Sequence, residues 1–243
     1  AIRTERGSIM AETLILSIQK ALRILDALIF EDTEGNGMSL TDLANRLGQR
    51  TTTVHNILKT MIRCGYVTQV QTGLYRAGKK CNDIQALPRV LPGGGLYAEV
   101  RRRLETLGAE LGESLTYSVF LGGKRMSVFR NDSRQPVRIV TAELDAQHMY
   151  SLVTGRVLTA FADEQGRADI LANHGFPGEH WDGIGNTGEW ERRLDEIRAA
   201  GYAVNFPPGE MVAMAVPVRI HPLGALGCFA PLYRCGEDTQ KRI

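Results

Sequence analysis

Two short amphipathic segments, separated by one glycine and followed by a strand–turn–strand pattern, constrain the fold of this chain more than any other feature. Apolar residues recur at helical spacing over residues 40–47 and again over residues 52–64, with Gly48 between them. Residues 66–77 then have the pattern of a hairpin with Gly73 in its turn. This order of elements predicts a winged helix-turn-helix, which places its second helix in the major groove of DNA.

Further helix signals surround this pattern. Ser39, with Asp42 three residues later, resembles a capping box at the start of the first segment. Upstream, the spacing predicts a helix from Ile18 to Phe30 with Ser17 as its N-cap. Its expected buried stripe consists of Ile18, Ala21, Leu22, Leu25, Leu28 and Ile29.

The polar face of the second segment holds the candidate DNA contacts. Short hydroxyls, an amide and basic groups can bond to phosphates or read base edges, and a basic residue on the wing can meet the DNA backbone. The predicted DNA-binding residues are Arg50, Thr51, Thr52, Thr53, His55, Asn56, Lys59, Arg63 and Arg76. An ordinary solvated helix face is the alternative interpretation of this surface.

Charge is unevenly distributed along the chain. Residues 1–81 carry a formal charge of +4, and residues 82–243 carry −2. A basic amino-terminal part is typical of a protein that contacts DNA through one domain. The four cysteines form no Cys-x-x-Cys pair, and no apolar run is long enough to span a bilayer. We therefore expect a cytoplasmic protein with no membrane partner.

The rest of the chain mixes helix and strand patterns. Helices are predicted from about residue 97 to residue 111 and over residues 152–162, 164–173 and 187–200. Strands are predicted over residues 115–121, 126–130, 137–141, 211–218 and 225–232, with the first two joined by a Gly-Gly turn. This mixture predicts an α+β fold with a largely antiparallel sheet flanked by helices.

Several motifs together resemble one known family. Residues 17–25, 40–48, 52–61 and 65–67 are similar to the three helices and the strand that follows them in the IclR family of bacterial transcriptional regulators. Residues 73–78, with the sequence Gly-Leu-Tyr-Arg-Ala-Gly, resemble the wing of that family. The resemblance implies double-stranded operator DNA as a partner.

The resemblance extends through most of the remaining chain. It is carried by residues 111–114, 151–158, 201–205, 215–218 and 224–227. It implies a GAF-like effector-binding domain and assembly into homodimers or dimers of dimers. The expected organisation is a winged helix-turn-helix domain over residues 1–80, a Pro- and Gly-containing linker over 81–98, and an effector-binding and oligomerisation domain over 99–243.

The resemblance also implies a pocket for a small-molecule effector. Its residues fall at Val153, Thr154, Asn205, Ala213, Ala230 and Leu232. An amide replaces the family's usual carboxylate at Asn205, and alkyl groups replace hydrogen-bonding groups at the last three positions. A hydroxyl-rich or doubly charged ligand would lose partners there. We therefore expect a more apolar or aromatic acid, or a pocket that no longer binds an effector; plain core packing is the alternative for each apolar position.

No catalytic motif stands out, so we predict no enzyme activity, no catalytic residue, no cofactor and no metal. His174 and His180, near Asp182, leave a metal site conceivable, but a surface loop is the simpler interpretation. The predicted function is a transcriptional regulator whose operator affinity depends on a small-molecule effector. The alternative is a winged-helix protein-interaction module attached to a GAF-like sensor, with no role on DNA.

Overall fold

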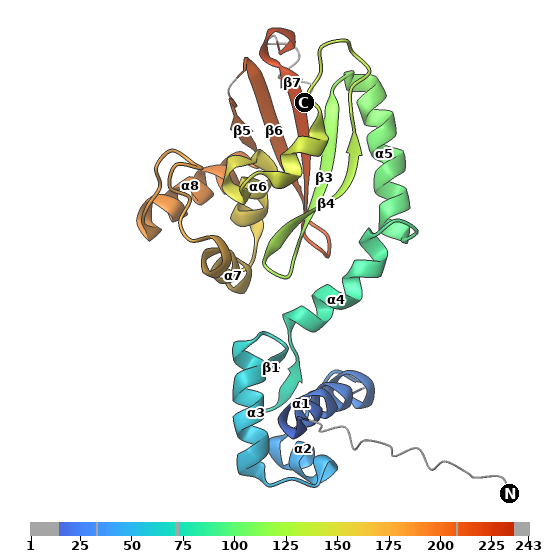
Figure 1. Ribbon diagram of the computed structural model, residues 1–243, viewed down its shortest axis with the longest axis vertical. Helices are drawn as coiled ribbons and strands as arrows, with labels where there is room; N and C mark the ends of the chain where they lie inside the picture. Colours follow the sequence, from blue (N-terminus) through green and yellow to red (C-terminus); the bar gives the residue numbers. More distant parts are fainter. Residues whose placement is uncertain (1–14, 33, 71–72, 208, 236–243) are drawn as a thin grey trace, which may run out of the picture. The chain divides into compact units, whose positions relative to one another are not determined.

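The computed structural model describes residues 15–32, 34–70, 73–207 and 209–235, and the chain divides into two compact units between Ile84 and Gln85. Figure 1 labels most of the helices and strands of both units. Each unit has hydrophobic cores of its own. None of the helices in the described ranges combines the length and the apolar composition that crossing a membrane requires.

The amino-terminal unit contains the helices and the hairpin that the sequence predicts (Figure 1). Its elements are α1 (Leu16–Asp26), a π-helical turn (Ala27–Glu31), α2 (Leu40–Leu47), α3 (Thr51–Arg63), β1 (Val67–Gln69) and β2 (Tyr75–Ala77). The core between the helices is built from Ile24, Leu28, Leu43, Leu47, Val54, Leu58 and Met61, with Val67 and Tyr75 from the hairpin. β1 and β2 pair antiparallel, and the wing prediction is confirmed except at residues 71 and 72, which lie outside the described residues.

The start and end of α2 follow directly from its sequence. Asp42 donates its backbone N–H to the Ser39 hydroxyl, and that hydroxyl donates to the Asp42 carboxylate. The helix ends at Gly48, whose φ of 61° lies in the left-handed region where glycine costs least. The tight turn this permits sets α3 across α2, as the sequence predicts.

The first helix differs from its prediction in start and in orientation. It begins at Leu16, and the N-cap Ile15 offers no side-chain hydrogen bond. Ile18 and Leu22 are each 55% exposed, whereas Ile24 is fully buried. The apolar residues of this helix span a wider part of its circumference than the other helices of the unit can cover. Only the side that carries Ile24 is therefore buried in the core.

The carboxy-terminal unit is built on a five-stranded antiparallel sheet in the order β4-β3-β7-β6-β5. The strands are β3 (Ser114–Leu121), β4 (Lys124–Asn131), β5 (Ala203–Asn205), β6 (Met211–Val218) and β7 (Gly224–Pro231). Every residue of β3 is buried, because both faces of the sheet are covered there. The predicted fold class, α+β with an antiparallel sheet flanked by helices, is confirmed.

Helices cover the two faces unequally (Figure 1). α6 (Val153–Phe161), α7 (Glu164–His174) and α8 (Thr187–Ala200) enclose the larger core on one face, with Tyr150, Leu158, Trp190 and Leu194 fully buried in it. On the other face, α5 (Gly95–Leu111) packs Leu104 against β3 and β4. The three predicted helices after residue 150 are confirmed.

The segment expected to link the two domains has helical structure of its own. Most of the expected linker over residues 81–98 is helical, in α4 (Lys79–Val90) and the first turn of α5, with a break only at residues 91–94. Ala86 and Val90 of α4 pack into the core beneath α5, and this burial explains why the segment is ordered.

The prediction of a strand over residues 137–141 is wrong, because the structure has no strand there. Val137 is exposed, and the chain enters a 3-10 helix at Thr141. Side chains satisfy this backbone in place of a strand: Ser114 donates its hydroxyl to the Ile139 carbonyl, and the Asp132 carboxylate accepts from the Thr141 N–H. Further 3-10 turns follow at Met149–Ser151 and Leu232–Arg234.

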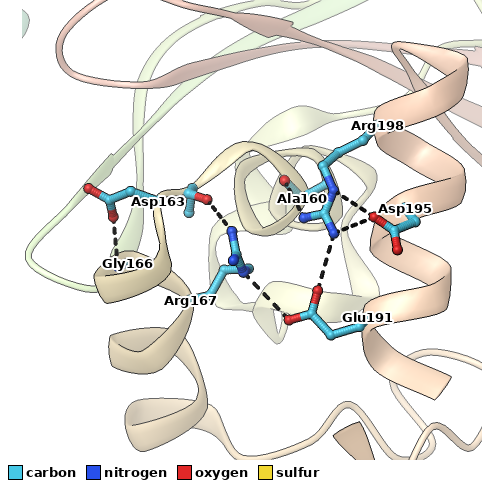
Figure 2. A network of polar contacts seen from close by, with 8 residues as sticks. Ala160, Asp163, Gly166, Arg167, Glu191, Asp195 and Arg198 are labelled. Carbon is cyan, nitrogen blue, oxygen red and sulfur yellow. Dashed lines mark hydrogen bonds and ion pairs between the residues drawn. The ribbon is translucent and has the colours of Figure 1, made fainter. Parts of the chain in front are cut away.

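Arginines from two helices meet the carboxyl end of α6 (Figure 2). Arg198 of α8 donates to the Ala160 carbonyl at 3.1 Å and pairs with Glu191 and Asp195 of its own helix. Arg167 of α7 donates to the Ala162 carbonyl and lies 3.6 Å from Glu191. Cations at the last carbonyls complement the helix dipole, so this network fastens α6, α7 and α8 together.

Candidate functional site

The candidate DNA-binding surface is the polar face of α3. The helix buries Val54, Leu58 and Met61 against the other helices of its unit, and this packing turns the opposite face to solvent. Exposed there are Arg50, Thr51, Thr52, His55, Asn56, Lys59 and Arg63, with Thr53 half-buried beside them. The four-residue spacing of His55, Lys59 and Arg63 aligns them along one side of the helix.

Most side chains on this face have no hydrogen-bond or ion-pair partner among the described residues. The side chains of Arg50, Thr52, His55, Asn56, Lys59 and Arg63 make no hydrogen bond or ion pair with any other described residue. Arg50 is also the N-cap of α3 and provides no side-chain cap, so the first N–H groups of the helix are left without a side-chain acceptor. The free N–H groups at such a helix start are suited to donate hydrogen bonds to a phosphate oxygen.

Arg76 is placed differently from the other candidates. It is half-buried on β2, its guanidinium donates to the Asn36 carbonyl at 3.3 Å, and its stem lies against Gly37. Its Nε is buried without a partner among the described residues. Arg76 therefore holds the loop before α2 against the wing, and its side chain reaches solvent less freely than those on α3.

The carboxy-terminal unit contains a small apolar cavity between α6 and the sheet. Its volume is about 40 Å³. Its walls are apolar apart from Gln147 and Ser151, and comprise Ile139, Leu144, Leu152, Val153, Pro207, Met211, Val212, Ala213 and Phe229. A space of this size holds one or two water molecules, and an engineered cavity that takes a benzene ring measures about 150 Å³.

The structure brings only part of the predicted pocket to this cavity. Val153 and Ala213 line it. Thr154 is buried with its methyl group against Gly227, so it faces the sheet. Asn205 lies close by and donates its amide to the Ser151 carbonyl at 3.4 Å.

Ala230 and Leu232 do not line this cavity. Ala230 pairs with Val212 and faces the opposite side of the sheet from Ala213, whose own partner across the ladder is Phe229. Leu232 begins a 3-10 turn and is 42% exposed. Side chains alternate between the two faces of a sheet along each strand. Pairing β6 with β7 across their hairpin would therefore have identified Phe229, the partner of Ala213, as a residue of the cavity.

Three histidine rings pack against one another in the carboxy-terminal unit. His148 stacks on His180 with ring centroids 4.0 Å apart, and His174 stands edge-on to His148 at 5.3 Å. Burial lowers the pKa of His148 and of His174, which favours their neutral forms. Within the described ranges, no group of three or more His, Cys, Asp or Glu residues is arranged to hold a metal ion.

Comparisons with known proteins agree on one kind of relative. A sequence model of the IclR helix-turn-helix domain matches residues 17–71. The HTH-type transcriptional regulator KdgR of Dickeya chrysanthemi is 26% identical over 93% of this chain and 74% of its own. The glycerol operon regulatory protein of Streptomyces coelicolor is 28% identical over 84% of this chain and 82% of its own.

A solved structure gives the same picture for the fold. The IclR protein of Thermotoga maritima superposes with a TM-score of 0.52 at 18% identity, covering 94% of this chain and 93% of that one. At that identity the likeness concerns the fold alone.

Proposed function

Because the chain is a transcriptional regulator of the IclR family, we propose that it binds double-stranded operator DNA through α3 and that a small organic acid modulates this binding. Two copies, as a homodimer or within a dimer of dimers, would place their α3 helices in successive major grooves roughly 34 Å apart. The protein would act in the cytoplasm, on chromosomal DNA.

One observation carries the DNA-binding proposal: the exposed face of α3 combines basic groups, hydroxyls and an amide that have no partners within the described chain. Asn56 is suited to reading an adenine edge, since its amide can donate and accept at once. Lys59 and Arg63 are suited to phosphates or to guanine.

Point variants on α3 test this proposal. A duplex bound by the full chain would first be selected from a random library, and its affinity for each variant measured by fluorescence anisotropy. Asn56→Ala and Lys59→Ala should each weaken binding roughly 5- to 150-fold, the range of about 1–3 kcal/mol for a specific contact. Lys124→Ala, which removes the same charge from an exposed position in the other unit, is the matched control. Unchanged binding by both α3 variants would refute α3 as the reading helix.

The cavity supports an apolar effector. Phe229, Met211 and Leu152 form its walls beside Val153, and Gln147 and Ser151 are its polar side chains. An aromatic acid needs more room than about 40 Å³, so its binding requires the segment before α6 to move outward. That movement is a population shift, and coupling of about 1–3 kcal/mol would change operator affinity on the order of 5- to 150-fold.

Thermal-shift measurements with chemically paired ligands test the effector proposal. Benzoate-like acids should raise the melting temperature of the full chain, and glyoxylate-like acids should raise it less. Ala213→Val narrows the cavity and should reduce the benzoate response. A stronger response to glyoxylate than to benzoate would contradict an apolar pocket.

A further inference from the structure

Arg156 of α6 is a buried cation that forms no ion pair with a carboxylate in the described part of the chain. Its side chain is only 7% exposed. The guanidinium donates from Nε to the Tyr150 carbonyl at 2.7 Å and from Nη2 to the His180 carbonyl at 3.3 Å. No carboxylate among the described residues lies within ion-pair distance of it. Buried arginines are nearly always paired, because an uncompensated charge away from water is costly.

A second arginine stands beside the first. The guanidinium carbons of Arg156 and of Arg193, from α8, lie 4.9 and 5.6 Å from the ring centroid of Trp181. Arg193 forms an ion pair with Asp182, with its Nη2 at 2.6 Å from the carboxylate. Burial lowers the pKa of Arg156 to about 10, Asp182 raises it, and the positive charge of Arg193 lowers it.

A pocket of about 180 Å³ opens onto these two guanidinium groups. Besides the arginines and Trp181, its walls include Tyr202 and Ile197, which are apolar enough to cover the body of a small ligand. It shares no lining residue with the cavity between α6 and the sheet. The volume accommodates a phosphate ion or a short carboxylic acid.

We propose that this pocket binds a small oxyanion, a carboxylate or a phosphate, between Arg156 and Arg193. A guanidinium has five N–H donors, and Arg156 uses two of them on carbonyls, so three remain for the oxygens of a ligand. The anion supplies the close negative partner that Arg156 does not have among the described residues.

The same pocket disfavours a ligand that carries two negative charges. Glu196 also lines it, and this carboxylate is shared with Arg193 at 3.5 Å and with Arg192 at 2.6 Å. A dianion would meet its repulsion, so a singly charged carboxylate is expected to bind more tightly than phosphate dianion. The site is independent of α3, so its failure would leave the DNA-binding proposal standing.

Fluorine NMR of the full chain, labelled with 5-fluorotryptophan, tests the site directly. The chain has two tryptophans, so Trp181 and Trp190 give two resonances that a Trp190→Phe variant assigns. Titration with acetate, and separately with inorganic phosphate, should shift the Trp181 resonance saturably and more than the Trp190 resonance. Chloride at the same ionic strength should not do so. Tighter binding of acetate would support the selectivity for single charge, and tighter binding of phosphate would overturn it.

Arginine variants then locate the binding. Arg193→Gln should weaken it roughly tenfold, as expected for a lost charge-assisted hydrogen bond. Arg134→Gln removes the same charge from an exposed position outside both pockets and should leave affinity unchanged. Arg156→Lys keeps the charge but loses the fork, and should also weaken binding. A Trp181 response that chloride reproduces, or equal effects of Arg193→Gln and Arg134→Gln, would overturn the proposal.

Discussion

At the scale of single residues, Gly155 shows how a missing side chain permits a close approach. It lies in the first turn of α6, and a Cβ added there would collide with the carbonyl oxygen of Met149. That carbonyl belongs to the backbone of the 3-10 turn that leads into the helix. The clash would therefore press a methyl group fixed on the helix backbone against the backbone of this turn. The approach fixes where the segment beside the apolar cavity enters α6.

The first prediction follows from this contact. Gly155→Ala should lower the free energy of unfolding by roughly 1–3 kcal/mol, the usual cost of overpacking. Gly188→Ala, in the first turn of α8 with only ordinary contacts around the added methyl group, should change stability little or raise it by up to about 1 kcal/mol. Guanidinium unfolding of both variants measures the difference, and equal effects would refute the steric explanation.

His148 gives a residue-scale prediction about pH. Burial lowers its pKa below the ordinary value of 6.5, and the neighbouring His180 and His174 lower it further. Its Nδ1 accepts the Tyr150 N–H at 3.3 Å, a bond that protonation would remove. Lys124 lowers the pKa of His174 in the same cluster, after burial. The fold therefore favours neutral histidine here.

The sign of the pH effect follows from this preference. The unfolded chain binds the proton more readily, so the contribution to stability is complete above about pH 6.5 and is lost as pH falls toward the folded pKa. Unfolding free energies measured between about pH 7.5 and pH 5.5 should decline, and His148→Asn should make that decline shallower. His55→Asn, at an exposed position on α3, is the control. A His148→Asn profile that matches wild type would contradict the prediction.

At the scale of elements, the helix layer depends on one arginine more than on its neighbours. Arg198 joins α8 to the end of α6 and its side chain is 29% exposed. Arg192, on the same helix, has a side chain that is 63% exposed and pairs with Glu196. Exposed pairs contribute little, but hydrogen bonds from a charged donor to a helix end contribute more (Figure 2).

Alanine substitution should separate the two arginines. Arg198→Ala is expected to cost roughly 1–2 kcal/mol of stability, and Arg192→Ala less than about 0.5 kcal/mol. Thermal or urea unfolding of the full chain gives both values. Equal losses would mean that the contact with Ala160 contributes nothing beyond an ordinary surface pair.

At the scale of the whole molecule, charge distinguishes the proposed regulator from the protein-interaction alternative. The amino-terminal part carries +4 and presents its free basic groups on α3, whereas the remainder is slightly negative. Binding to DNA releases counterions, with a slope of about −0.9 in log affinity against log salt for each phosphate contacted.

The salt slope is therefore a direct measurement of partner type. Affinity for the selected duplex should fall steeply between low and physiological salt, and Lys59→Ala should reduce the slope by roughly one unit for each phosphate contact removed. Lys124→Ala should leave the slope unchanged. A shallow slope in the wild-type protein would favour the protein-interaction module.

The sequence by itself determined the elements whose signals are local. The Ser39 cap, the Gly48 turn, the Gly122–Gly123 hairpin and the apolar periodicity of α3 and α8 each act within a few residues, so their prediction needed no knowledge of distant neighbours. The same locality made the polar face of α3 visible in the sequence.

Tertiary structure alone decided which side of an ambiguous element is covered, and which distant groups meet. Only the core decided that α1 would bury Ile24 and leave Leu22 exposed. Only strand pairing set Phe229, and not Ala230, beside Ala213, because a shift of one residue reverses the face of a side chain. Arg156 and Arg193 lie on different helices, and only their packing around Trp181 brings both to one pocket.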